Sequence, residues 1–142
     1  MSPTPFSAPL TLLLVEDNAN FAASVKGYLA AMDHISVVGH AVDAPQAVAR
    51  VIEFHPDLVL LDIALGHGNG FDVARCLSTL DHAPAVIFLT MHDQLAYRNQ
   101  ASALGALALV GKDRFVQDLT PLLHTLVARH RAGESLVQPF IY

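Results

Sequence analysis

The 142-residue sequence has a single cysteine, Cys76, and no tryptophan. One cysteine cannot form an internal disulfide, and its sparing use fits a reducing compartment. No apolar run approaches the roughly 18 residues that cross a bilayer. The first ten residues, "MSPTPFSAPL", also lack the basic start and long apolar core of a secretory signal. We therefore expect a soluble, cytoplasmic protein with no membrane partner.

Positive charge is also scarce. The chain has 8 Lys and Arg against 13 Asp and Glu, a net charge of −5, and no basic run. Nucleic-acid phosphates need a basic face, so we expect no direct nucleic acid contact by this chain. The 8 histidines form neither H-x-H nor H-E-x-x-H. Their spacing therefore predicts no histidine metal motif, and we interpret most of them as surface or helix-end residues.

Apolar residues, in contrast, make up 53% of the chain, which is long enough for one domain with a real core. Short apolar runs alternate with segments whose apolar residues recur at helical spacing. The runs predict strands at 10–15, 35–42, 58–61, 85–90 and 106–110. The segments predict helices at 20–32, after Asp43 and Pro45, at 70–80, at 94–104 and towards the C-terminus.

The last helix has two possible starts. It begins either at Thr120 as N-cap, with Pro121 in the first helical position, or earlier with a kink. Gly133 is expected to end it. The remaining residues form a tail that is either disordered or docked through Phe140 and Tyr142.

A βα unit repeated five times predicts a parallel sheet with helices on both faces. Ligands of such sheets bind at the carboxyl ends of the strands. Five polar residues fall at those ends and are expected to converge: Glu16, Asp17, Asp62, Thr90 and Lys112.

Asp62 directly follows the apolar run "LVLL". Burying an unpaired carboxylate costs several kcal/mol, so Asp62 must reach solvent or be met by other groups. Clustered carboxylates raise one another's pKa unless a cation separates them. Lys112 offsets one charge, and Mg²⁺, which prefers oxygen ligands, is the natural partner for the rest. The alternative for Glu16 and Asp17 is a simple helix N-cap.

Four segments resemble the receiver domain of response regulators: "LLLVEDN", "HPDLVLLDIALGHGNGFDV", "VIFLTMHD" and "GALALVGKD". The resemblance covers about residues 10–132, which leaves an N-terminal extension, 1–9, and a C-terminal tail, 133–142. It implies an α/β, flavodoxin-like (βα)5 fold, with a doubly wound parallel five-stranded sheet of order 2-1-3-4-5.

The resemblance also implies roles. Asp62 is similar to the phosphoacceptor of the family. Asp17 and Asp62 would bind Mg²⁺ directly, Glu16 through water, and Ala64 through its backbone carbonyl. Thr90 resembles the switch hydroxyl that hydrogen-bonds the phosphoryl group. Lys112 resembles the lysine that pairs with the aspartate and then with a phosphoryl oxygen.

The function implied is transfer of a phosphoryl group from a sensor histidine kinase, or a phosphotransfer protein, to Asp62. Signalling would then pass through a protein partner or an output domain, and a homodimer stays open. The alternative is a receiver-like interaction module that works without phosphorylation. The chain would catalyse only its own phosphorylation and dephosphorylation. A phosphatase of the haloacid-dehalogenase type would need an acid at the position of Ala64. The sequence ends too soon to hold a helix-turn-helix domain, so we expect a stand-alone receiver or part of a longer regulator.

Several positions depart from the common receiver pattern. Leu109 replaces an aromatic residue and is expected simply to pack. Gly66 replaces a frequent proline, and with the neighbouring glycines it predicts an unusually mobile loop. Met91 replaces a small residue near the phosphoryl entrance, which predicts slow phosphorylation by small donors. His92 stands at a position that tunes hydrolysis of the acyl phosphate.

Overall fold

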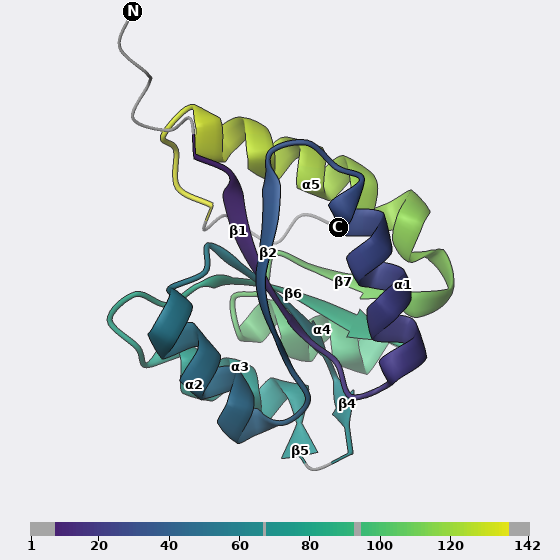
Figure 1. Ribbon diagram of the computed structural model, residues 1–142. Coiled ribbons are helices and arrows are strands. Elements are labelled where there is room, and N and C mark those ends of the chain that lie inside the picture. Colours follow the sequence, from purple (N-terminus) through teal and green to yellow (C-terminus); the bar gives the residue numbers. More distant parts are fainter. Residues whose placement is uncertain (1–7, 67, 93–94, 137–142) are drawn as a thin grey trace, which may run out of the picture.

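The computed structural model describes residues 8–66, 68–92 and 95–136. Its centre is a parallel five-stranded sheet (Figure 1). The order β2-β1-β3-β6-β7 is the predicted 2-1-3-4-5 topology in other labels, so the expected fold class is confirmed. The strands are β1 (Leu10–Val15), β2 (Ile35–Ala41), β3 (Leu58–Asp62), β6 (Ala85–Thr90) and β7 (Ala108–Gly111).

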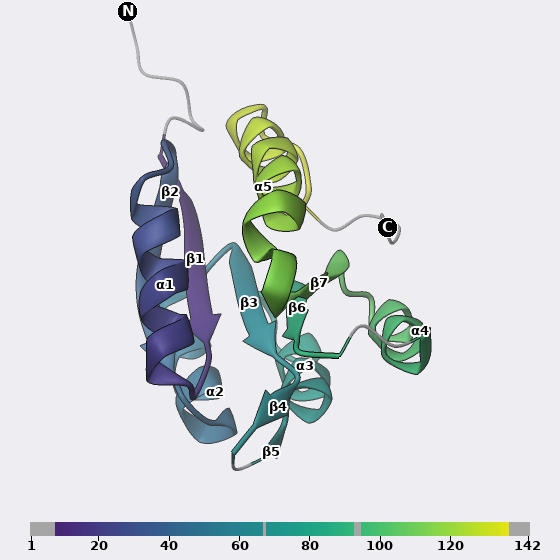
Figure 2. The same cartoon turned by 90° about the vertical axis from the view of Figure 1, so that its right-hand side faces the viewer.

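Helices cover both faces of the sheet (Figures 1 and 2). The apolar sides of α1 and α5 pack on one face, and those of α2, α3 and α4 pack on the other. Their bounds are α1 (Ala19–Ala30), α2 (Ala44–Phe54), α3 (Gly70–Ser78), α4 (Leu95–Ala103) and α5 (Phe115–Arg131). Residue 94, the expected start of α4, lies outside the described residues.

Strand β1 is apolar except for Thr11, and its burial explains why. Leu12 and Leu14 point into the core beneath α1 and α5, whereas Leu13 and Val15 point into the core beneath α2 and α3. All four side chains are fully buried. A strand covered on both faces has no solvent side on which to carry polar residues.

The helix starts follow local capping chemistry. The Asp43 side chain accepts a hydrogen bond from the backbone N–H of Gln46, with Pro45 in the first turn of α2, as predicted. At α1 the cap is Asn18, whose Oδ1 accepts from the N–H of Phe21 at 2.9 Å. The alternative that the acidic pair caps α1 is therefore wrong, and both carboxylates stay available to the site.

Helix α5 takes the earlier of its two possible starts. It begins at Phe115, and Pro121 lies inside it. The Phe115 ring packs edge-on against Phe21 and Tyr28, with centroid distances of 5.3 and 5.4 Å. This packing holds the turn before the proline in helical form. Gly133 follows the helix with φ 74°, which confirms the predicted end.

Two local features were not predicted. The glycine-rich loop after β3 contains a two-stranded antiparallel pair, β4 (Ala64–Leu65) and β5 (Gly68–Asn69). A 3₁₀-helix, Lys112–Arg114, joins β7 to α5. Phe140 and Tyr142 lie outside the described residues. Within the described ranges, no helix is long and apolar enough to span a membrane.

Candidate functional site

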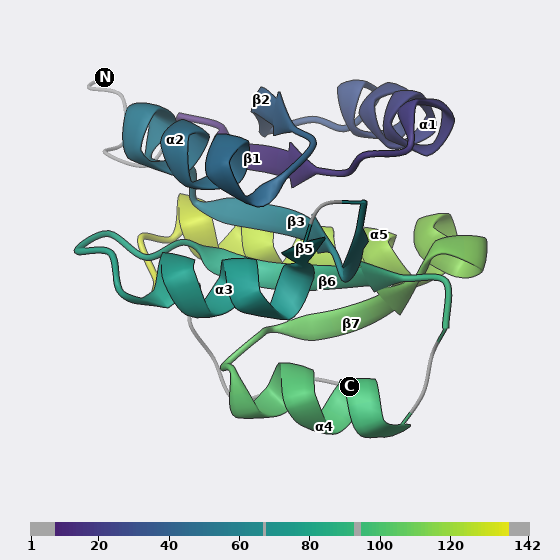
Figure 3. The ribbon, with the colours of Figure 1, turned by 90° about the horizontal axis from the view of Figure 1, so that it is seen from below.

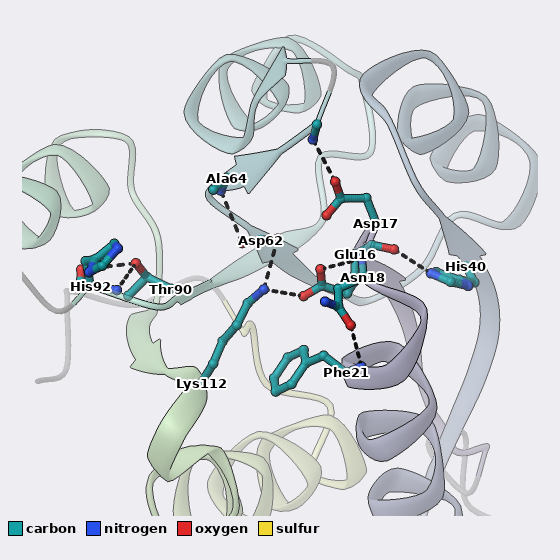
Figure 4. Close-up of polar contacts among 11 residues, drawn as sticks. Glu16, Asp17, Asn18, Phe21, His40, Asp62, Ala64, Thr90, His92 and Lys112 are labelled. Carbon is teal, nitrogen blue, oxygen red and sulfur yellow. Dashed lines mark hydrogen bonds and ion pairs between the residues drawn. The ribbon is translucent and has the colours of Figure 1, made fainter.

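The five polar residues predicted at the strand ends all lie at the carboxyl edge of the sheet (Figure 4). Glu16 and Asp17 follow β1, Asp62 ends β3, Thr90 ends β6, and Lys112 follows β7. A parallel sheet brings these ends together because all five strands run in one direction. The convergence inferred from the strand pattern is thus present.

Lys112 is held between two buried carboxylates. Its Nζ lies 2.7 Å from Oε1 of Glu16 and 3.0 Å from Oδ2 of Asp62. The ammonium also sits 4.8 Å from the centre of the Phe21 ring, which adds a cation–π contact. Burial alone would lower the pKa of Lys112, but its bonds to Glu16 and Asp62 outweigh burial and raise the pKa. The lysine therefore stays charged.

Asp62 does not reach solvent, because only 2% of its surface is exposed. Other groups meet it instead. Lys112 contacts one oxygen, and the backbone N–H of Ala64 donates to Oδ1 at 3.1 Å. The pKa of Asp62 is raised from its ordinary 3.8 to about 6: burial is the largest cause, the Glu16 carboxyl adds to the rise, and Lys112 opposes it. One ammonium does not compensate the carboxylates around it.

Asp17, in contrast, is exposed, and a backbone contact fixes its orientation. The N–H of Gly66 donates to its Oδ2 at 2.7 Å. A Cβ added to Gly66 would lie 2.9 Å from the same oxygen, so only glycine fits without displacing the carboxylate. This contact ties the β4–β5 pair to the acidic cluster.

Gly70 allows the close approach of two chain segments beneath Asp62. A Cβ at Gly70 would lie 2.2 Å from the backbone oxygen of Asp62 and 2.9 Å from Cα of Ile63. The Gly70 N–H also donates to the Ile63 carbonyl at 2.8 Å. A side chain here would push the loop away from the end of β3. Gly70 therefore lets the chain turn closely beneath Asp62 after this loop.

Thr90 is buried at the end of β6, with its hydroxyl bonded locally. Its Oγ1 accepts from the N–H of His92 and donates to the His92 carbonyl, both at 3.0 Å. Met91, between them, is 70% exposed. Leu109 is only 5% exposed and lies in the core with Phe88, as the packing interpretation predicts.

The donor set suits a hard divalent cation. Glu16, Asp17 and Asp62 each offer a carboxylate oxygen, and these oxygens lie within 4.8 Å of one another. Three carboxylates face one ammonium, which leaves excess negative charge in a largely buried pocket. Burial first, and then the neighbouring Glu16 carboxyl, raise the pKa of Asp62. Oxygen-rich sets of this kind are typical of Mg²⁺ sites. The role of the Ala64 carbonyl as a ligand stays a prediction.

Comparison with known proteins agrees with this geometry. The sequence model of the response regulator receiver domain matches residues 12–124. The chain belongs to the response regulator receiver family. Members of this family act in two-component signalling. The matched range lies inside the expected 10–132, but the domain limits themselves stay predictions.

Among full-length relatives, the chain is 32% identical over 114 residues to the sensory transduction protein LytT of Bacillus cereus. It is 33% identical over 107 residues to a protein-glutamate methylesterase/protein-glutamine glutaminase of Rhizobium etli. The matches cover 78% and 75% of this chain but only 46% and 31% of those proteins. The receiver thus spans less than half the length of both relatives.

Solved structures show the same fold. A LuxR-family two-component response regulator from Aurantimonas superposes with a TM-score of 0.78 at 24% identity, covering 90% of this chain and 89% of that one. A CheY-like receiver domain protein from Methanospirillum hungatei gives 0.76 at 20% identity, covering 89% and 99%.

Sequence reasoning missed two contacts of the site. The Gly66 amide is a backbone group, so no side-chain pattern could indicate it. His40 lies on β2, and its Nε2 contacts the backbone oxygen of Glu16 at 2.8 Å while its Nδ1 contacts Lys26 at 2.9 Å. Only the pairing of β2 with β1 brings His40 there, so its position depends on topology.

Proposed function

We propose that this receiver accepts a phosphoryl group on the Asp62 carboxylate. The observation that carries the proposal is the pairing of buried Asp62 with Lys112, 3.0 Å away, inside a three-carboxylate cluster. A merely structural carboxylate at the end of an apolar strand would not need two acidic neighbours. An acceptor that works with Mg²⁺ would need them.

The proposed reaction is phosphoryl transfer from a phosphohistidine of a sensor kinase or phosphotransfer protein. A carboxylate oxygen of Asp62 attacks phosphorus, and a P–O bond forms as the P–N bond breaks. The bond electrons leave with the donor imidazole, which takes up a proton, and Asp62 becomes an acyl phosphate. Catalysis of such transfers is mainly positioning and electrostatic stabilisation.

The chain's own groups have distinct proposed tasks. Asp17 and Asp62 would hold Mg²⁺, with Glu16 acting through water, and the bound ion would supply positive charge for the phosphoryl oxygens. Lys112 would move from Asp62 to a phosphoryl oxygen after transfer. Thr90 would exchange its bonds to His92 for one to the phosphoryl group. The product carries about −1.5 to −2 charges where one carboxylate stood, which drives that exchange.

Output is proposed to pass through another domain or protein. The relatives named above are longer than this chain, and one of them is a methylesterase and glutaminase. The receiver is therefore proposed to control an attached or separate effector, with no chemistry on other molecules of its own.

The direct test is phosphorylation of the whole chain with acetyl phosphate and Mg²⁺, followed by intact-mass measurement. We expect addition of one phosphoryl group to the wild type and none to Asp62→Asn. Asp81→Asn is the matched control, because Asp81 is an exposed aspartate in the loop before β6. Beryllofluoride, which mimics the phosphoryl group, should perturb the amide NMR signals of Thr90 and Lys112 in the wild type only.

A second outcome would favour the alternative function. If neither acetyl phosphate nor beryllofluoride acts on the wild type in Mg²⁺, the chain is a phosphorylation-independent interaction module. Phosphorylation of the Asp62→Asn variant to the wild-type level would also contradict the proposal, since the acceptor would then be another residue.

A further inference from the structure

Three histidines far apart in the sequence line one pocket at the amino-terminal ends of the strands, on the side of the sheet opposite Asp62. His55 follows α2, His82 lies in the loop between α3 and β6, and His130 lies in the last turn of α5. In Figure 3 the yellow end of α5 and the loop after α3 lie on the side away from the strand arrowheads. No sequence spacing could indicate this grouping, because it depends on the crossover connections.

The three side chains line one pocket of about 540 Å³, together with Asp57 and Glu134. The His55 and His82 rings are edge to face, with centroids 5.6 Å apart and planes at 86°. Both residues are exposed, so their rings can turn. Two imidazoles on one tetrahedral ion, at metal–nitrogen distances of roughly 2.0–2.1 Å, have centroids about 5 Å apart. The observed centroid distance is close to that value.

His130 has a partner on one side only. Its Nδ1 lies 3.9 Å from Oδ2 of Asp57, an aspartate held in place by hydrogen bonds from the backbone N–H and the hydroxyl of Thr11. Its Nε2 is buried and has no hydrogen-bond partner within the described part of the chain. The 3.9 Å separation is longer than a hydrogen bond, but Asp57 lies on the side where metal-binding histidines usually have a carboxylate, and Nε2 is left without a partner among the described residues.

The surrounding backbone also favours a cation. Helices α2, α3 and α5 all end on this side of the sheet, so the negative ends of their dipoles point towards the pocket. The carboxylates of Asp57 and Glu134 add negative charge there, and Glu134 is paired with Arg129 at 3.8 Å on the exposed side. Imidazole nitrogen mixed with carboxylate oxygen suits Zn²⁺, Ni²⁺ or Cu²⁺ better than Mg²⁺.

We propose that His55, His82 and His130 form a second metal site, which takes a divalent transition metal ion such as Zn²⁺, with Glu134 as an exposed oxygen ligand. The site is not fully preassembled: within the described ranges, only the acidic cluster has three ligating residues whose atoms lie within 4.8 Å. Ordering of exposed rings opposes binding, so the affinity should be micromolar. The ion would join the ends of α2, α3 and α5.

The test is calorimetric titration of the full chain with Zn²⁺ in excess Mg²⁺, which competes for the acidic cluster. We expect one Zn²⁺ per chain, at least tenfold weaker binding in His55→Asn and His82→Ala, and no change in His124→Ala. Asparagine is chosen at position 55 because that residue has φ 46°, a conformation that asparagine tolerates. His124 is the matched control, an exposed histidine that lines a different pocket.

Two further measurements make the result decisive. Cu²⁺ in place of Zn²⁺ should show nitrogen hyperfine coupling in its electron paramagnetic resonance spectrum, reduced in His82→Ala. Metal-free circular dichroism melting checks that each variant folds. The proposal is overturned if Zn²⁺ does not bind, if binding survives in both His55→Asn and His82→Ala, or if His124→Ala loses it equally. Binding that disappears in Asp62→Asn would also overturn it, by assigning the ion to the acidic cluster.

Discussion

The backbone N–H of Gly66 donates a 2.7 Å hydrogen bond to Oδ2 of Asp17 and fixes an otherwise exposed carboxylate. We expect Gly66→Ala to weaken Mg²⁺ binding roughly fivefold, the equivalent of about 1 kcal/mol, because the new Cβ would displace that oxygen. The shift of the melting temperature with Mg²⁺ concentration measures this affinity.

Gly27→Ala is the control for that substitution. Gly27 lies in α1, and a Cβ there meets nothing within 4 Å. Alanine at this position should raise the stability slightly through helix propensity and leave the Mg²⁺ dependence unchanged. Equal Mg²⁺ dependence in Gly66→Ala and Gly27→Ala would show that the Gly66 contact does not position Asp17.

Asp62→Asn should stabilise the metal-free protein at pH 7. Burial and the neighbouring Glu16 hold the pKa of Asp62 at about 6, above its ordinary 3.8. The folded chain therefore binds this proton more tightly than the unfolded chain. The protonated carboxyl contributes stability that is fully present below about pH 4 and is lost as the pH rises through about 6. Ionisation at pH 7 costs about 1 to 3 kcal/mol.

Urea unfolding in EDTA, followed by circular dichroism, measures that effect. The free energy of unfolding of Asp62→Asn should exceed that of the wild type at pH 7, with a smaller difference at pH 5. Asp81→Asn, at an exposed site, should show no such trend. A gain for Asp62→Asn that does not change between pH 5 and 7 would rule out ionisation of Asp62 as its cause.

Lys112→Met should destabilise the metal-free protein, in contrast to Asp62→Asn. The Lys112 side chain is only 9% exposed and separates Glu16 from Asp62. Its removal leaves two buried carboxylates without a cation, which should lower the free energy of unfolding by about 3–5 kcal/mol at pH 7 in EDTA. The same urea titration measures the loss.

Two variants test the cause of that loss. Lys26→Met, the same substitution at an exposed position of α1, should cost far less. Asp62→Asn should add more stability in the Lys112→Met background than in the wild type, because without Lys112 the buried Asp62 carboxylate loses the cation beside it. If Asp62→Asn changes the free energy of unfolding by the same amount with and without Lys112, the two side chains do not interact as the 3.0 Å contact indicates.

The parts of this protein that could be predicted are those set by local pattern. Continuous apolar runs such as that of β1 can be buried only on both faces, and alternation with helices then dictates a parallel sheet. A parallel sheet brings the residues after its strands to one edge, so Glu16 and Asp62 could be placed together before any coordinates.

The unpredicted parts depend on contacts between distant segments. The glycine-rich loop after β3 was expected to be unusually mobile, and that stays a prediction; the β4–β5 pair within it and the hydrogen bond from the Gly66 N–H to Asp17 were not foreseen. The start of α5 was left open because Pro121 suits a first turn. The packing of Phe115 on Phe21, which lies 94 residues earlier in the sequence, favours the earlier start of α5. Tertiary packing here outweighs local preference.

Met91 bears on the rate of phosphorylation by small donors. It follows Thr90 directly and is 70% exposed, at a position where receivers commonly have a small residue. Given the proposed phosphoacceptor role, we expect Met91→Ala to react severalfold faster with acetyl phosphate, because truncation widens the approach to Asp62. Leu95→Ala is the matched control, since Leu95 is 73% exposed but belongs to α4 and does not directly follow Thr90. Intact-mass time courses at fixed Mg²⁺ measure both rates. Equal rates in the wild type and Met91→Ala would show that this side chain does not restrict entry.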